Sequence, residues 1–152
     1  MRETLPVAGE PVASSTVAAR PTWLRVGALV AGDALSFVVF ATVGRHSHNE
    51  ASGLSAIGVT LATAAPFAAG WFAVSPFVGA FRRAKTASLK AMLTRTELAW
   101  LCAWPAAALL RWAFGPDHKL PLSFAIVILI ANAVFLSVWR SLFALVEGRR
   151  RA

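Results

Sequence analysis

The chain has 152 residues, of which 57% are hydrophobic and 14% are charged, whereas an average soluble domain is about 45–50% apolar and about 25% charged. A core of this size cannot bury so much apolar surface, so the composition excludes an ordinary water-soluble domain and predicts a lipid environment. The formal net charge of +8 fits nucleic acid, an anionic membrane or acidic partners. The single cysteine, Cys102, excludes an internal disulfide.

Residues 1–22 contain three prolines and scattered apolar residues without a helical or strand period, which predicts a disordered N-terminal tail. The first compact apolar stretch begins near Trp23, too far along the chain for a typical secretory signal. We therefore expect a retained first helix, a four-helix transmembrane domain over residues 23–146 and a basic tail over residues 147–152.

Four apolar segments are long enough to cross a bilayer, which takes about 17–25 residues, and together they hold only five of the charged residues. The segments are Trp23–Val43, Leu54–Ala80, Glu97–Phe114 and Leu122–Val146. Backbone groups in hydrocarbon must be satisfied internally, and barrel strands would be shorter and alternating. The sequence therefore predicts an all-α protein, a bundle of four transmembrane helices.

Local signals place some helix boundaries. Thr94 and Glu97 have the spacing of a capping box, which predicts that the third helix begins there. Pro121 suits the first turn of the fourth helix. Pro66 and Pro76 fall inside the second segment, where each removes a backbone hydrogen bond and favours a kink.

The Lys and Arg residues predict the orientation of the helices. If the N-terminus is cytoplasmic, that side carries ten of them and the opposite side carries only Arg45 and Lys119. The cytoplasmic ten are Arg2, Arg20, Arg82, Arg83, Lys85, Lys90, Arg95, Arg149, Arg150 and Arg151. This bias predicts that both termini are cytoplasmic, and it argues against nucleic acid as a partner because the charge is partitioned by side.

Residues 82–96 mix five basic residues with apolar ones. A solvated connector that follows the positive-inside rule explains this composition. A short helix lying on the anionic inner leaflet is the alternative.

Small residues recur every four positions in each predicted helix. The second helix carries Gly58, Ala62, Pro66 and Gly70; the first carries Ala28, Gly32 and Ser36; the third carries Ala99, Ala103 and Ala107; the fourth carries Ala133, Ser137 and Ser141. Such positions allow close approach of helices in lipid. They predict a compact bundle, and a homodimer seam would use the same chemistry.

Tryptophan placement also follows the predicted spans. Trp23, Trp100, Trp112 and Trp139 lie toward helix ends, where an indole suits the membrane interface. Trp71 and Trp104 lie farther from the ends, which favours packing in the core over lining a pocket.

Asp33 falls halfway along the first predicted helix, where a charge costs about 2.5–3.5 kcal/mol on insertion scales. It therefore needs a partner, a water-filled cavity or a proton, and the candidate hydrogen-bond partners are Asn132, at similar depth, and Ser36, one turn away. Such a polar site either fixes the register of the helices or relays a proton or cation.

Three arginines lie within the apolar segments, namely Arg25, Arg111 and Arg140. Each is close enough to a predicted helix end to extend its guanidinium toward the headgroups. Asp33 lies at a different predicted depth from Arg140, so we do not expect these two residues to pair.

The outer loops carry a candidate metal site. In an extended segment His46, His48 and Glu50 point the same way, and His118 from the second outer loop could join them as ligands for zinc or copper. A short polar loop at a membrane surface is the alternative. We identify no catalytic constellation and no cofactor motif.

Several short patterns occur along residues 25–145, namely Gly32-Asp33, Phe40, Gly44-Arg45-His46-Ser47-His48, Pro66-Phe67, Gly70-Trp71, Arg111, Ser123-Phe124 and Trp139-Arg140. Together they resemble an uncharacterised family of small prokaryotic multi-pass membrane proteins, domain of unknown function 3054. The most specific is the Gly-Arg-x-Ser-His run, in which the family often has a second Arg where this chain has His46. The resemblance implies a multi-helix membrane protein and no particular activity.

The sequence therefore predicts a multi-pass protein of the cell inner membrane with no identified enzymatic activity, and an enzyme that uses the histidine-rich outer loop is the third hypothesis after the two that follow. A structural or accessory subunit is the first hypothesis, because the chain is small and poor in convergent polar groups. A transporter or proton-coupled carrier built around Asp33 and Asn132 is the second. The expected partners are the lipid bilayer and further copies of the chain or subunits of a membrane complex.

Overall fold

The computed structural model describes residues 22–46, 54–115 and 119–149. The described segments form four α-helices, with one short 3-10 helix and no strand. The helices are α1 (Thr22–His46), α2 (Leu54–Val78), α3 (Leu89–Phe114) and α4 (Leu122–Arg149), and the 3-10 helix η1 spans Arg83–Lys85. The prediction of an all-α protein is confirmed.

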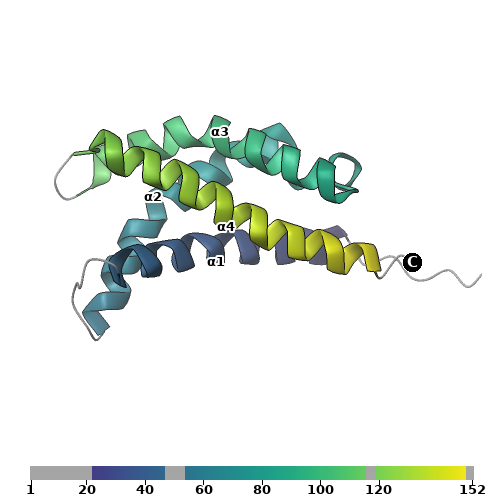
Figure 1. Ribbon diagram of the computed structural model, residues 1–152, viewed down its shortest axis with the longest axis horizontal. Coiled ribbons are helices and arrows are strands. Elements are labelled where there is room, and N and C mark those ends of the chain that lie inside the picture. The colour runs from purple at the N-terminus through teal and green to yellow at the C-terminus, as the bar shows by residue number, and fades with distance from the viewer. Residues whose placement is uncertain (1–21, 47–53, 116–118, 150–152) are drawn as a thin grey trace, which may run out of the picture.

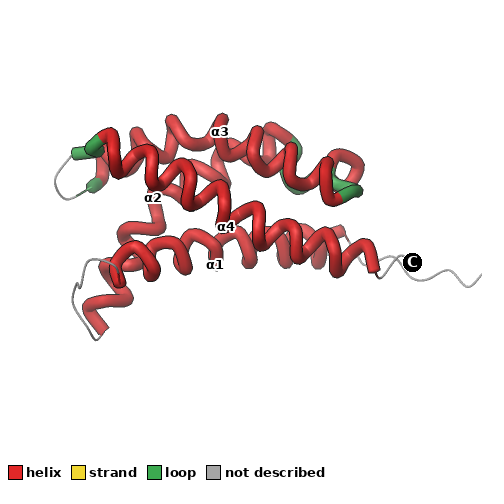
Figure 2. Tube along the Cα trace, in the orientation of Figure 1, coloured by secondary structure: helices red, strands yellow, loops and turns green. Residues whose placement is uncertain are grey.

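Successive helices run in opposite directions (Figure 1). As a result, α1 begins and α4 ends at the end of the bundle that also holds the connector between α2 and α3. We call residues 79–88 the basic connector. It contains η1 and is one of the few stretches among the described residues that lie outside the α-helices (Figure 2).

The helix α2 is continuous across Pro66 and Pro76 and ends in a defined C-terminal cap. Gly79 has a φ of 82°, and its N–H donates to the Pro76 carbonyl at 3.0 Å while the Ala80 N–H donates to the Ser75 carbonyl at 3.1 Å. This is the Schellman arrangement, in which glycine tolerates the left-handed conformation. It ends α2 two residues before the predicted boundary.

The start of α3 differs from the sequence prediction. The helix begins at Leu89, where the Ser88 hydroxyl oxygen accepts from the Ala91 N–H at 3.2 Å. The predicted capping box at Thr94 and Glu97 is therefore wrong, because both residues lie inside α3. Serine is a preferred N-cap, and its position gives α3 26 residues.

The core of the bundle has aromatic side chains at its centre and small residues where the helices touch. Phe37, Trp71 and Trp100 are fully buried, and the ring centroids of Phe37 and Trp100 are 5.7 Å apart. Trp71 therefore has its predicted core position. The expectation of an interfacial Trp100 is wrong, because its indole N–H donates to the Leu129 carbonyl at 2.9 Å inside the bundle.

Small residues bring the helices together as predicted. Ala99, Ala103 and Ala107 of α3 are completely buried. A Cβ added to Gly70 of α2 would lie 2.7 Å from the Ala107 backbone, whereas one added to Gly58 would meet nothing within 4 Å. Within the predicted ladder, α2 therefore approaches the α3 backbone closely at Gly70 and not at Gly58.

The outer surface of the bundle is apolar. Many large side chains are exposed there, including Leu35, Leu61, Leu109 and Ile130. Three helical segments are long and apolar enough to cross a membrane, namely Thr22–Gly44, Ala56–Val78 and Leu122–Arg149. These features define a membrane protein, because such a surface is stable in lipid and costly in water.

Candidate functional site

A buried ion pair between Asp33 of α1 and Arg140 of α4 lies within the bundle. Both side chains are completely shielded from solvent. The Arg140 Nε donates to Oδ1 of Asp33 at 3.0 Å and Nη2 donates to Oδ2 at 2.6 Å. Two parallel bonds of this kind fix the geometry as well as the charge, so the pair sets the register between α1 and α4.

The pair has further partners on the α2 side of the bundle. The Trp71 indole N–H donates to Oδ2 of Asp33 at 3.0 Å, and Nη1 of Arg140 donates to the Ala80 carbonyl at 2.8 Å. The guanidinium also lies 5.1 Å from the Trp71 ring and 5.0 Å from the Phe81 ring, within the range of cation–π attraction. Arg140 therefore joins α1, α4 and the end of α2.

A second ion pair joins the same two helices nearer the end of the bundle. The Arg25 Nε donates to Oε1 of Glu147 at 3.0 Å. Its Nη1 donates to the Phe81 carbonyl at 3.2 Å and its Nη2 donates to the Thr86 hydroxyl at 2.9 Å. The Arg25 side chain is buried, with 5% of the residue exposed. Through these bonds Arg25 ties the basic connector to α1 and α4.

The two pairs are arranged reciprocally. In α1 the arginine precedes the acid by eight positions, and in α4 the arginine precedes the acid by seven. Because the helices are antiparallel, each arginine meets the acid of the other helix. We call Arg25, Asp33, Arg140 and Glu147 the double ion pair.

The helices that carry the double ion pair touch closely beside the Asp33–Arg140 pair. Gly32 of α1 lies against the Trp139 ring, and an added Cβ would overlap the indole. The glycine next to Asp33 thus lets α4 approach near enough for the neighbouring Arg140 to reach the carboxylate.

The sequence expectations for the arginines need correction. Arg25 and Arg140 were expected to extend toward the headgroups, but both are buried and form ion pairs. The expectation that Asp33 and Arg140 lie too far apart in depth is wrong. Arg111 is half-buried, with its guanidinium 6.0 Å from the Phe124 ring.

The other residues predicted around Asp33 make local hydrogen bonds. Asn132 and Ser36 are buried, as expected for intramembrane positions. The Asn132 side-chain amide donates to the Ile128 carbonyl at 3.1 Å, and the Ser36 hydroxyl donates to the Gly32 carbonyl at 2.9 Å. The partners found for Asp33 are instead Arg140 and Trp71.

The candidate metal ligands lie outside the residues that the structure describes in full. His48, Glu50 and His118 are not among the described residues, and of His46 only the helical backbone is described. The outer-loop metal site therefore stays a prediction.

Comparison with known families assigns the chain to one of them. A family model described as protein of unknown function (DUF3054) matches residues 30–143. The chain belongs to this family, which confirms the resemblance noted in the sequence. No curated protein and no solved structure matches the chain.

Proposed function

We propose that all four helices cross the membrane and that both termini are cytoplasmic. The helix α3 has 26 residues and is as long as its neighbours; at 1.5 Å per residue it extends about 39 Å, enough for a bilayer. It packs along α2 and α4, so a bilayer around those helices also surrounds α3. The basic residues of the connector and Arg149 of α4 share one end of the bundle, which supports a cytoplasmic location for that end.

Cysteine labelling tests this topology. In a Cys102→Ser background, Ser88→Cys lies in the basic connector and Lys119→Cys lies at the opposite end of the bundle. We expect a membrane-impermeant maleimide to label Lys119→Cys in intact cells and Ser88→Cys only after permeabilisation. Labelling of both from the same side would exclude a spanning α3.

We further propose that the protein is a structural or accessory subunit in the cell inner membrane. The observation that carries this proposal is the closed double ion pair. Both carboxylate oxygens of Asp33 are occupied by protein donors, and the side chain is inaccessible to solvent. An acid held in this way fixes the positions of helices rather than presenting a binding group to a solute.

Native mass spectrometry after gentle extraction with lipids tests the accessory role. We expect a stoichiometric assembly, either with further copies of the chain or with other membrane subunits. The double variant Asp33→Leu/Arg140→Met, which replaces the pair with apolar groups, should retain that assembly. Recovery of the wild-type chain only as a monomer would contradict the proposal.

A proton-coupled carrier is the second candidate, because ionisable residues deep in membrane helices often mark transport pathways. Its test is a proteoliposome assay in which a trapped dye reports proton flux. A carrier would give flux that Asp33→Asn abolishes, with Glu97→Gln as a control at another acidic position. A structural role predicts the same background leak for all three proteins.

A further inference from the structure

Another acidic side chain of the bundle lies apart from the double ion pair. Glu97 of α3 is half-buried, and the Ser137 hydroxyl of α4 donates to its Oε1. Among the residues that the structure describes, Glu97 makes no other side-chain hydrogen bond and no ion pair. Its second carboxylate oxygen, Oε2, is therefore left for a group from outside the bundle.

The depth of Glu97 makes this carboxylate unusual. Its partner Ser137 is fifteen residues after Leu122 and nine residues before Val146, the two ends of the fourth apolar segment. At 1.5 Å per residue, Ser137 lies about 22 Å from one end of that segment and about 14 Å from the other. An acid inside a membrane span is costly and pairs with cations or hydrogen-bond donors. Glu97 has one donor, Ser137, and no cation.

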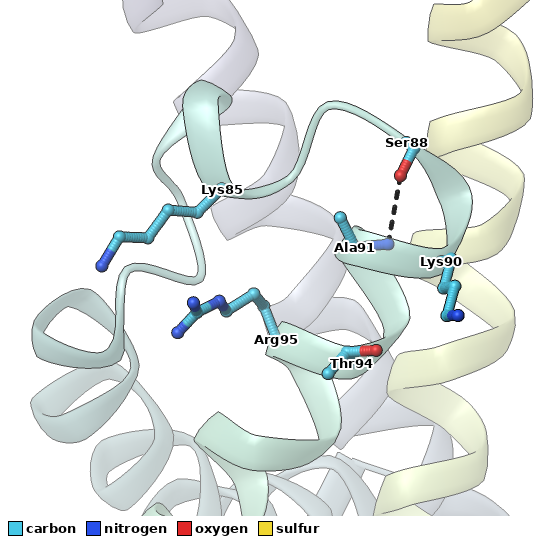
Figure 3. Close-up of a pocket in the computed structure, with 6 residues that line it drawn as sticks. All are labelled: Lys85, Ser88, Lys90, Ala91, Thr94 and Arg95. Carbon is cyan, nitrogen blue, oxygen red and sulfur yellow. Dashed lines mark hydrogen bonds between the residues drawn. The ribbon is translucent and has the colours of Figure 1, made fainter.

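The arginines of the described helices do not neutralise Glu97. Arg25 and Arg140 are buried in the double ion pair. Arg111 is fourteen residues further along α3, which is about 21 Å along the helix axis. Arg95 is only two residues away, but residues with this spacing lie on different faces of a helix. Its side chain extends away from α4 (Figure 3), whereas Glu97 contacts α4.

The surface around Glu97 has room for a further helix. Leu101, one turn after Glu97 in α3, is exposed, so this side of α3 faces the lipid. In α4, Ala133, Ser137 and Ser141 recur every four residues and are only half-buried. Small residues at this spacing let another helix approach closely in lipid. The face therefore combines an acid with a place for a helix backbone.

A second copy of the chain does not supply the missing cation. Copies inserted in the same direction hold each residue at the same depth, so the cation must come from a residue near the depth of Glu97. Arg140 is near that depth, but it is completely shielded from solvent in its own pair. Arg95 extends on the same side as Lys85 of the basic connector (Figure 3). The charge of this face is therefore complementary to a helix of a different subunit.

We propose that the face around Glu97 and Ser137 docks a transmembrane helix of another membrane subunit, through a Lys or Arg within that helix. The cation pairs with the Glu97 carboxylate, and the small residues of α4 let the two backbones approach. This inference rests on the proposed accessory role and names the chemistry of the partner.

A designed transmembrane peptide tests the chemistry of the docking face. The probe is a Leu/Ala helix of about 24 residues with one Lys about nine residues from its end, and its control has Leu in place of that Lys. Energy transfer in vesicles reports binding to the full-length chain, labelled at Lys119→Cys in a Cys102→Ser background. We expect the Lys peptide to bind about tenfold more tightly, as for a polar contact between membrane helices. Equal affinities would overturn the proposal.

Variants of the chain assign the preference to one side chain. Glu97→Gln should lower the affinity for the Lys peptide to that for the Leu peptide. Glu97→Asp keeps the acid and should retain most of the preference, and so should Ser137→Ala, which removes only the hydroxyl donor. Circular dichroism verifies that each variant keeps its helices. A preference for the Lys peptide that survives Glu97→Gln would show that another group binds the cation.

Native mass spectrometry of the chain from its own membranes separates this inference from the accessory role. We expect a subunit with a Lys or Arg inside an apolar span, which Glu97→Gln releases and Glu97→Asp keeps. An assembly that persists in Glu97→Gln contradicts the docking face and leaves the accessory role intact. A wild-type chain recovered only as a monomer contradicts both.

The same measurement distinguishes a second copy as the occupant. An assembly of identical chains that dissociates in both Glu97→Gln and Arg95→Gln would assign the cation to Arg95 of another copy and would overturn the proposal. We expect Arg95→Gln to leave the assembly unchanged.

Discussion

Asp33 and Arg140 are 107 positions apart in the chain, yet their side chains meet in a two-bonded ion pair that is completely buried. Removal of one partner from such a pair costs about 3–5 kcal/mol because the other charge remains buried. The pair therefore ties the first helix to the last, and its loss affects the whole bundle.

Trp71→Phe removes the indole donor to Asp33 and keeps an aromatic ring beside Arg140. A hydrogen bond to a charged group contributes about 1.5–3 kcal/mol, so we expect the free energy of unfolding to fall by about that amount. Unfolding in mild detergent, followed by circular dichroism, measures the loss. Trp112→Phe is the control because Trp112 is 53% exposed; a similar loss in both variants would contradict the role of the indole N–H.

Arg25→Met removes the donors that hold the Phe81 carbonyl and the Thr86 hydroxyl. We expect the amides of residues 82–88 to exchange hydrogen with solvent faster, since opening of a segment is governed by its local contacts. Hydrogen exchange with mass spectrometry measures this rate. Arg149→Met removes the same charge from an exposed position at the same end of the bundle and should leave the exchange unchanged.

Gly70→Ala tests the close contact of α2 with α3. The new methyl group would lie 2.7 Å from the Ala107 backbone, and overpacking of this kind costs about 1–3 kcal/mol. Gly58→Ala meets nothing within 4 Å and should stabilise α2 by about 0.5–1 kcal/mol through its helix propensity. Thermal unfolding in detergent should therefore shift in opposite directions, and a shared direction would contradict the packing.

Gly32→Ala tests the approach of α1 to α4 beside Asp33. The added methyl group would overlap the Trp139 ring, so the indole must move and the neighbouring Arg140 is displaced with it. We expect a loss of about 1–3 kcal/mol in the free energy of unfolding. Gly27→Ala, which meets nothing within 4 Å, should show no loss.

The all-α fold could be predicted from the sequence, because it follows from the length of the apolar segments. That Asp33 makes polar contacts inside the bundle could be predicted too, because a charge without them is costly in lipid. The partner of Asp33 could not, because its identification depends on helix ends. The predicted fourth segment stopped at Val146, whereas α4 continues to Arg149. Arg140 therefore lies nine residues from the end of its helix and Asp33 lies eleven from the start of α1. At 1.5 Å per residue these depths differ by about 3 Å, which an arginine side chain can bridge.

One signal in the sequence could have identified the double ion pair. Arg25 and Asp33 in the first helix have nearly the same spacing as Arg140 and Glu147 in the last, and antiparallel helices align each arginine with an acid. The match is not apparent when the fourth segment is ended at Val146, because Glu147 then falls in the basic tail.

The Asp33–Arg140 pair acts as a structural lock that holds α1 and α4 in register. A double-mutant cycle of Asp33→Leu, Arg140→Met and the combined variant, measured as the free energy of unfolding in mild detergent, tests it most directly. We expect each single variant to lose about 3–5 kcal/mol and the combined variant to regain most of it, because no charge is left buried without a partner. Additive losses in the combined variant would contradict the lock.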